Sequence, residues 1–253
     1  MKKHPTSCEL TGSIPPNRRL VRPINRASGT QCPGFTLLEI LVAMFIFGLV
    51  ITLVFTSFDG VFSNADHVNA SSDLFEMGKT CLDRISADLQ DLHVSTYPRY
   101  KPPDINDKPE IYRVVGQEAN VGGGSFAKLR FTSLAHLALN QDTREGIAEI
   151  VYYVQAIDNG TYVLRRADKL YPYPEFEENP ADPVMCEKVL GFELIYYDAQ
   201  GHEFKTWNSE DDEYEYSTPR SIAIKLTLGD ANASYVFSTE IAPPMYRYRS
   251  IKR

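Results

Sequence analysis

The chain has 253 residues, of which 43% are hydrophobic and 23% are charged, a composition typical of a globular protein. Its net charge of −7 is unevenly distributed, because residues 1–34 carry six basic side chains and one acidic side chain, whereas the remainder carries 20 basic and 32 acidic ones. An acidic body has too few cations to neutralise phosphates, which argues against nucleic acid as a partner.

The longest uncharged stretch runs from Ile40 to Phe58, between Glu39 and Asp59. At about 1.5 Å per residue, these 19 residues would span roughly 28 Å as a helix, close to the roughly 30 Å thickness of a bilayer core. Basic residues stay on the cytoplasmic side of such a helix. We therefore predict a single-pass membrane protein, with residues 35–58 in the membrane, a cytoplasmic N-terminus and an exported acidic body.

The motif GFTLLE, Gly34–Glu39, directly precedes the apolar stretch. A secretory signal peptide would be cut after its apolar run at small residues, but no A-x-A pattern follows Phe58. The motif together with the apolar helix resembles the processing signature of type IV pilins and pseudopilins. The resemblance implies that a prepilin peptidase cuts between Gly34 and Phe35 and methylates the new amine of Phe35. Residues 1–34 would then be a removable basic leader.

Glu39 is a carboxylate at the membrane boundary, where a charge without a counter-ion is costly. Cleavage after Gly34 would create an amine at Phe35 that is mostly protonated at neutral pH and lies about 6 Å along the helix from Glu39. In the pilin superfamily the matching glutamate pairs with the amine of a neighbouring subunit, so the resemblance implies an assembly role for Glu39. The alternative is a snorkelling interfacial side chain on a simple membrane anchor.

The helix is expected to continue beyond the membrane, because no proline occurs between Phe35 and Tyr97. One helix of about 58 residues is the simplest interpretation, with residues 59–97 as its exported half. A break near Asp59 and Gly60 is the alternative. An apolar stripe with mostly seven-residue spacing is expected to pack on the rest of the protein; it comprises Val61, Val68, Phe75, Leu82, Ile85, Leu89 and Leu92.

After a proline-rich segment the hydrophobic period changes to two, which predicts an antiparallel β head over residues 98–242 and an α+β fold class. Asp158–Gly160 is a hairpin signal. The basic tail, residues 243–253, is either mobile or in contact with an acidic neighbour. The expected strands are Lys128–Ser133, Ile147–Ile157, Thr161–Arg166, Gly191–Tyr197, Glu203–Trp207, Ser221–Leu228 and Tyr235–Ile241.

Four segments of the head, together with the processing motif, resemble the J-type minor pseudopilin of type II secretion. They are LRFTS (Leu129–Ser133), VLGFELIYYDAQG (Val189–Gly201), the single Trp207 and TPRSIAIKLTL (Thr218–Leu228). The resemblance implies a pilin-like fold in which the long N-terminal helix packs on an antiparallel sheet. It also implies a filament subunit in the inner membrane with a periplasmic head.

The same resemblance implies a place at or near the tip of the pseudopilus, which helps to push folded proteins across the outer membrane. Its implied partners are the I-, K- and major G-type pseudopilins, the prepilin peptidase and the inner-membrane assembly platform. Two alternatives remain: a minor type IV pilin for adhesion, motility or DNA uptake, and a single-pass membrane-anchored enzyme or sensor.

No motif in the chain indicates catalysis. The five histidines show no H-E-x-x-H spacing, no G-x-S-x-G motif occurs, and the glycine-rich segment Val121–Ser125 lacks the ending of a phosphate-binding loop. We therefore expect neither an enzyme nor a cofactor. An acidic run lacks the spacing of a calcium loop, so a solvated loop is expected, with calcium binding as the alternative; the run comprises Glu210, Asp211, Asp212 and Glu213.

Two cysteines lie beyond the expected cleavage site, Cys81 on the helix and Cys186 in the head. In an exported protein the environment permits a disulfide between them. The pair can form only if the two Cα atoms lie within about 7 Å of each other. Two separate buried thiols are the alternative.

Overall fold

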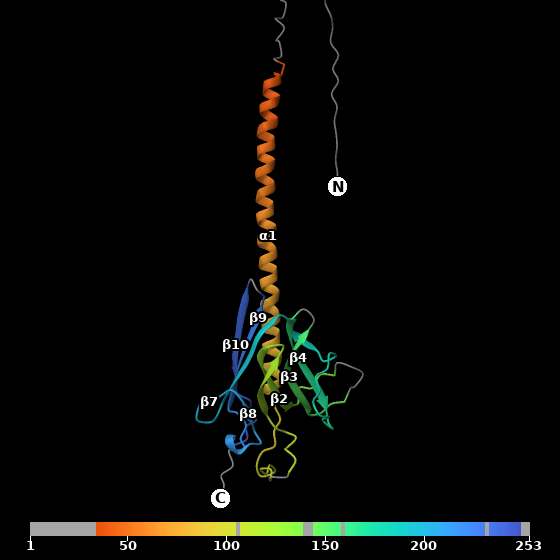
Figure 1. Ribbon diagram of the computed structural model, residues 1–253, viewed down its shortest axis with the longest axis vertical. Coiled ribbons are helices and arrows are strands. Elements are labelled where there is room, and N and C mark those ends of the chain that lie inside the picture. The colour runs from red at the N-terminus through yellow and green to blue at the C-terminus, as the bar shows by residue number, and fades with distance from the viewer. Residues whose placement is uncertain (1–33, 105–106, 139–143, 158–159, 231–232, 249–253) are drawn as a thin grey trace, which may run out of the picture. The chain divides into compact units, whose positions relative to one another are not determined.

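A computed structural model describes residues 34–104, 107–138, 144–157, 160–230 and 233–248, without the side chains of residues 59–70 (Figure 1). The expected leader up to residue 33, the first two residues of the hairpin signal and the last five residues of the tail lie outside this description. The chain divides into two compact units, Met1–Phe58 and Asp59–Arg253. Each unit is described here by itself.

A single helix, α1, runs from Leu37 to Gln90. This confirms the predicted single helix, without the alternative break near Asp59 and Gly60. It ends earlier than expected, because the chain beyond it bonds to a sheet instead. Leu92 forms a β-bridge with Ser133, and the His93 amide donates to the Thr132 carbonyl at 2.8 Å. Residues 91–97, expected to be helical, therefore lie outside α1.

The head consists of two antiparallel sheets, which confirms the predicted α+β class (Figure 1). The six-stranded sheet has the order β5 (Val184–Cys186), β4 (Thr161–Leu170), β3 (Ala148–Ile157), β2 (Gly124–Ser133), β1 (Val115–Val121), β8 (Trp207–Asn208). The four-stranded sheet has the order β10 (Ser234–Ile241), β9 (Ser221–Gly229), β6 (Val189–Tyr197), β7 (Glu203–Phe204). A short 3₁₀ helix, η2, covers Asp212–Tyr214.

Most predicted strands are present, but two strands were not predicted and one prediction was wrong. The sequence of β1, VGQEANV, is polar, and β5 has only three residues, so neither shows a hydrophobic alternation. The predicted strand Glu203–Trp207 is split, because β7 pairs with β6 while Trp207 in β8 pairs with β1 of the other sheet. Trp207 is buried there, and its indole N–H donates to the Ser217 carbonyl at 3.0 Å.

The C-terminal half of α1 packs against both sheets in one hydrophobic core. Leu82, Ile85, Leu89 and Leu92 are buried in this core, as the predicted stripe required. Phe75 is 59% exposed, however, and its neighbour Leu74 is the buried residue at that turn. The seven-residue spacing thus predicted the stripe correctly near its C-terminal end and misplaced it at Phe75.

The two faces of the six-stranded sheet have different surroundings, because successive residues of a strand point to opposite faces. On β2, Leu129 and Phe131 are buried in the same core as α1. The alternating residues Lys128 and Arg130, which precede and follow Leu129, are only partly buried and belong to the other face. A second small cluster lies on this outer face; it comprises Val151, Tyr153, Ala167 and, from the segment between β4 and β5, Phe176.

Candidate functional site

The expected processing segment lies at the start of α1. Thr36 acts as the N-cap, because its hydroxyl accepts a hydrogen bond from the Glu39 amide at 3.2 Å. The spacing of Thr36 and Glu39 is that of a capping box. Phe35, just before the cap, is 77% exposed, and Glu39 is also exposed. The sequence motif therefore also sets the start of the helix, a role of Thr36 that sequence analysis had not assigned.

The first turns of α1 present an apolar surface on every side. Leu37–Phe58 is the one helical stretch in the described residues that is long and apolar enough to cross a membrane, and none of it is buried. Its two threonine hydroxyls are satisfied within the helix, since Thr52 donates to the Gly48 carbonyl at 2.9 Å and Thr56 to the Thr52 carbonyl at 2.8 Å. A helix with satisfied hydroxyls and an apolar surface is suited to lipid.

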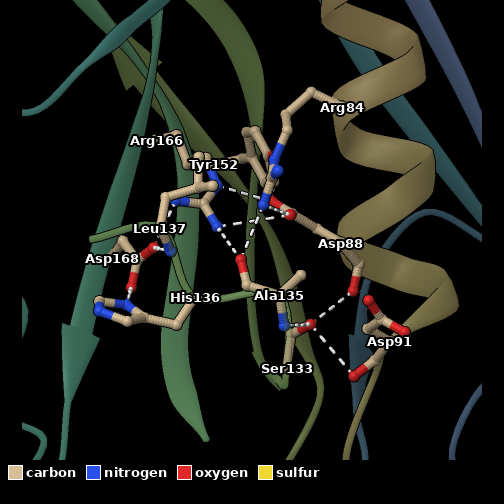
Figure 2. Close-up of polar contacts among 10 residues, drawn as sticks. All are labelled: Arg84, Asp88, Asp91, Ser133, Ala135, His136, Leu137, Tyr152, Arg166 and Asp168. Carbon is tan, nitrogen blue, oxygen red and sulfur yellow. Dashed lines mark hydrogen bonds and ion pairs between the residues drawn. The ribbon is translucent and has the colours of Figure 1, made fainter. Parts of the chain in front are cut away.

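A buried ionic cluster joins α1 to the six-stranded sheet of the head (Figure 2). Asp88 on α1 has no solvent exposure and accepts a hydrogen bond at 2.6 Å from each of Tyr152 Oη and Arg166 Nε. Arg84 forms an ion pair with the same carboxylate. Asp88 therefore links one turn of α1 to β3 and β4.

The cluster continues across the sheet through Asp168 (Figure 2). Arg166 Nη1 donates to Asp168 Oδ2 at 2.6 Å, and His136 Nδ1 lies 2.6 Å from Asp168 Oδ1. The Leu137 amide donates to the same carboxylate at 2.8 Å. These contacts also tie the chain segment after β2 to β4.

The charges of the cluster stabilise one another. Burial alone would lower the pKa of Arg166, but the hydrogen bonds and negative charge of Asp88 outweigh this effect and raise the pKa. Burial, together with Asp88, also raises the pKa of Tyr152 well above its ordinary value. Tyr152 is thus a neutral hydrogen-bond donor and Arg166 a permanent cation, which suits a structural anchor rather than proton transfer.

The structure brings Cys81 and Cys186 together in the core of the head. Both thiols are free and buried, one on α1 and the other on the edge strand β5. A hydrogen bond between the two thiols, followed by burial, raises the pKa of Cys186. The two thiols are thus close enough to interact, and the disulfide itself stays a prediction.

Glu210, a member of the acidic run, binds the C-terminal segment of its own chain. Arg247 is completely buried; its Nη2 donates to Glu210 Oε1 at 2.6 Å, and its guanidinium lies 3.5 Å from the ring centre of Tyr100. The Arg247 amide also donates to Thr218 Oγ1 at 2.9 Å. The tail is therefore docked at Arg247 on an acidic side chain of the same molecule.

This arrangement does not provide a set of ligands for a calcium ion, the alternative interpretation of the acidic run. Asp211 caps η2 by accepting a hydrogen bond from the Glu213 amide at 3.0 Å, while Glu210 is engaged by Arg247. Within the described part of the chain, no three His, Cys, Asp or Glu side chains are placed to hold a metal ion. Calcium binding by Glu210, Asp211, Asp212 and Glu213 remains an untested prediction.

Asp88, Arg166 and Arg247 were not singled out from the sequence. Asp88 occupies a position on the apolar stripe of α1, three residues after Ile85, and an acid at a core position is the one signal that could have indicated it. The sequence gives no comparable signal for Arg166 or Arg247, because arginine is also common on exposed strands and in chain termini.

Two family models match the chain. The family "Type II secretion system (T2SS), protein J" matches residues 56–238, and the prokaryotic N-terminal methylation motif matches residues 31–55. A type IV-like pilin from Thermus thermophilus has a similar structure with a TM-score of 0.41 and 8% identity, over 68% of this chain and 95% of that chain. A search of curated proteins gives no significant match.

The family match covers most of the chain, from the helix α1 into β10, and the methylation motif covers the Gly34–Glu39 segment. Both agree with the resemblance found in the sequence. Members of this family are structural subunits rather than enzymes, and the apolar start of α1 is consistent with a membrane-anchored protein. The chain belongs to the family of type II secretion system protein J and is a minor pseudopilin.

Proposed function

We propose that this protein is a non-catalytic subunit at or near the tip of the type II secretion pseudopilus, where it helps to push folded proteins across the outer membrane. The single observation that carries the proposal is the joint match to protein J and to the methylation motif on one chain. Its partners are the I-, K- and major G-type pseudopilins, the prepilin peptidase and the inner-membrane assembly platform.

Processing between Gly34 and Phe35 is part of the proposal. Gly34 and Phe35 precede the Thr36 cap, are exposed and lie outside the helix, which supports access of a peptidase to the peptide bond between them. Cleavage there removes the basic leader and leaves Phe35 as the N-terminal residue, which is then methylated. The protein would stay in the inner membrane through Leu37–Phe58, with its head in the periplasm.

The uniformly apolar surface of Leu37–Phe58 supports a filament core as well as a membrane anchor. The same side chains that contact lipid can contact the equivalent helices of neighbouring subunits, because both surroundings are apolar. Glu39 is the one charged residue in this stretch. Pairing of its carboxylate with the Phe35 amine of a neighbouring subunit would fix the axial position of each subunit.

Co-purification from native membranes tests the proposed place in the pseudopilus. The affinity-tagged protein should recover the I- and K-type pseudopilins encoded by the same genome. Its gene deletion should leave folded exoproteins in the periplasm. Recovery of type IV pilus subunits alone, with normal secretion in the deletion strain, would instead support a minor type IV pilin.

The N-terminal residue is tested by mass spectrometry of the protein isolated from membranes. We expect an N-methylated phenylalanine at position 35, and an intact leader after the substitution Gly34→Leu. A native N-terminus upstream of residue 35 would contradict the processing step and favour a simple membrane anchor.

A further inference from the structure

A pocket of about 500 Å³ lies on the outer face of the six-stranded sheet, the face turned away from α1. Its floor is formed by β1, β2 and β3, including the outward residues Lys128 and Arg130 of β2. Its walls come from two connecting segments, residues 108–111 before β1 and residues 173–176 after β4. The volume is in the range of pockets that bind small ligands or short peptide segments.

Arg113 is the feature of this pocket that calls for a ligand. It lines the pocket and is half buried, and its guanidinium forms no hydrogen bond or ion pair with any described residue. Its Nε is buried and has no partner, which costs free energy unless some group accepts the hydrogen bond. Burial, and then repulsion from Arg130, lower the pKa of Arg113, and the negative charges of Glu149 and Glu210 offset this effect only in part.

Arg130, the second guanidinium, is only partly satisfied. It pairs with the nearly buried carboxylate of Glu149, but its Nη1 is buried without a partner in the described structure. Four basic and three acidic side chains line the pocket, so the lining itself carries one net positive charge, with Glu178 near Lys128 and Glu210 near Arg113 outside the lining. One singly charged carboxylate would balance it, and its two oxygens match the planar donors of arginine.

The walls of the pocket carry apolar side chains beside their charged ones. Phe176 lies under the Lys128 ammonium, 4.0 Å from the nitrogen to the ring centre, and Ile111 and Pro174 also contribute to the lining. A free small anion would leave these surfaces exposed to water. A carboxylate carried between apolar side chains would cover them.

We propose that this pocket binds an acidic peptide segment, with a glutamate or aspartate carboxylate at Arg113 and flanking apolar side chains against Phe176 and Ile111. The pocket faces away from the core that holds α1, so a bound segment would not compete with the packing of the helix. The site is thus compatible with a second polypeptide bound to the head, whether or not the protein is assembled in a filament.

Ligand-observed NMR on the full-length protein in detergent micelles tests the proposal. The probe is the peptide Ac-Leu-Glu-Leu-NH2, and its control is Ac-Leu-Gln-Leu-NH2, which has the same shape without the charge. We expect the acidic peptide to bind at least tenfold more tightly than the amide peptide. Arg113→Gln should remove this preference, and it should not unfold the head, because the Arg113 guanidinium has no partner within the described chain.

Arg99→Gln is the matched control, since Arg99 is an exposed arginine outside the pocket and should not affect binding. Lys128→Gln is a second variant and should weaken the acidic peptide severalfold. Equal binding of the two peptides, or an equal loss in Arg99→Gln and Arg113→Gln, would overturn the site. Binding of acetate as tightly as the acidic peptide would show that the apolar walls contribute nothing and would overturn the assignment to a peptide.

Discussion

Asp88 is a carboxylate without solvent exposure that is held by two guanidinium groups and a phenol, those of Arg84, Arg166 and Tyr152. Such a group is costly to bury unless each of its oxygens is paired. Its contacts also define the register between α1 and the six-stranded sheet, because a shift of one helical turn would remove Asp88 from Arg166 and leave Asp168 as the remaining carboxylate partner of the guanidinium. Residues of this kind determine which packing of helix and sheet is stable.

We predict that Asp88→Ala destabilises the head by about 3–5 kcal/mol, because it leaves the buried guanidinium of Arg166 without its main partner. Thermal unfolding of the protein in detergent, followed by circular dichroism, measures the effect. Asp91→Ala is the control, since Asp91 is exposed three residues further along the chain. Similar melting temperatures for the two variants would contradict the anchoring role of Asp88.

The contact between Cys81 and Cys186 leads to a second prediction at this scale. In the periplasm a thiol-oxidising enzyme can remove two hydrogen atoms from the pair and form a disulfide, which would stabilise the head by about 2–4 kcal/mol. Mass spectrometry without reductant should find the peptides of Cys81 and Cys186 linked. Recovery of both as alkylatable thiols from freshly isolated membranes would refute the bond, with the Cys186→Ser variant as the unlinked reference.

At the scale of secondary-structure elements, what each segment packs against explains which sequence patterns predicted its buried residues correctly. The stripe of α1 was predicted with a seven-residue period, but a straight helix has 3.6 residues per turn and drifts away from that period. Leu74, about three helical turns before Ile85, lies on the same face as that residue and is buried, whereas Phe75 is exposed. Gly78 allows close approach of β10, since a Cβ there would lie only 2.5 Å from Phe237 Cε2.

The basic composition of the C-terminal segment is a misleading guide to its structure. Its basic residues predicted either a mobile tail or a contact with an acidic neighbour. Arg247 instead lies against Tyr100 and Glu210 of the same chain. We predict that Arg247→Ala lowers the melting temperature strongly, because Glu210 would be left nearly buried without its ion-pair partner. Tyr248→Ala, which changes the exposed next residue, should have little effect. Equal stability of the two variants would mean that the segment is not docked in solution.

At the scale of the whole molecule, the chain combines the apolar stretch Leu37–Phe58 with a head that has its own core. The head has its own hydrophobic core, whereas the side chains of Leu37–Phe58 find no core in the described structure. The apolar unit therefore needs lipid or the helices of other subunits. This need connects the fold to the proposed function, since the same helix can be an anchor before assembly and a filament core after it.

We predict that Glu39→Gln leaves membrane insertion and leader cleavage intact but reduces incorporation into filaments at least tenfold, because the neutral side chain cannot pair with the Phe35 amine. Immunoblots of sheared filaments and of membranes measure the two steps separately. Glu76→Gln, at an exposed acid on α1 outside the apolar stretch, should assemble normally. Normal incorporation of Glu39→Gln would remove the assembly role of this carboxylate.

The sequence by itself determined the class of the protein: the GFTLLE motif, the apolar stretch and the change of period from helix to strands predicted the α+β fold and the pilin superfamily, and segments of the head such as Thr218–Leu228 added the resemblance to protein J. These are local signals, since each depends on residues close together in the chain. Only the tertiary structure decided that the head has two sheets, that Asp88 and Arg166 pair across the core, and that Arg113 lines a pocket without a partner. These features join residues far apart in the sequence. Burial strengthens the interactions of their charges and raises the cost of leaving them unpaired, and this burial exists only after the chain has folded.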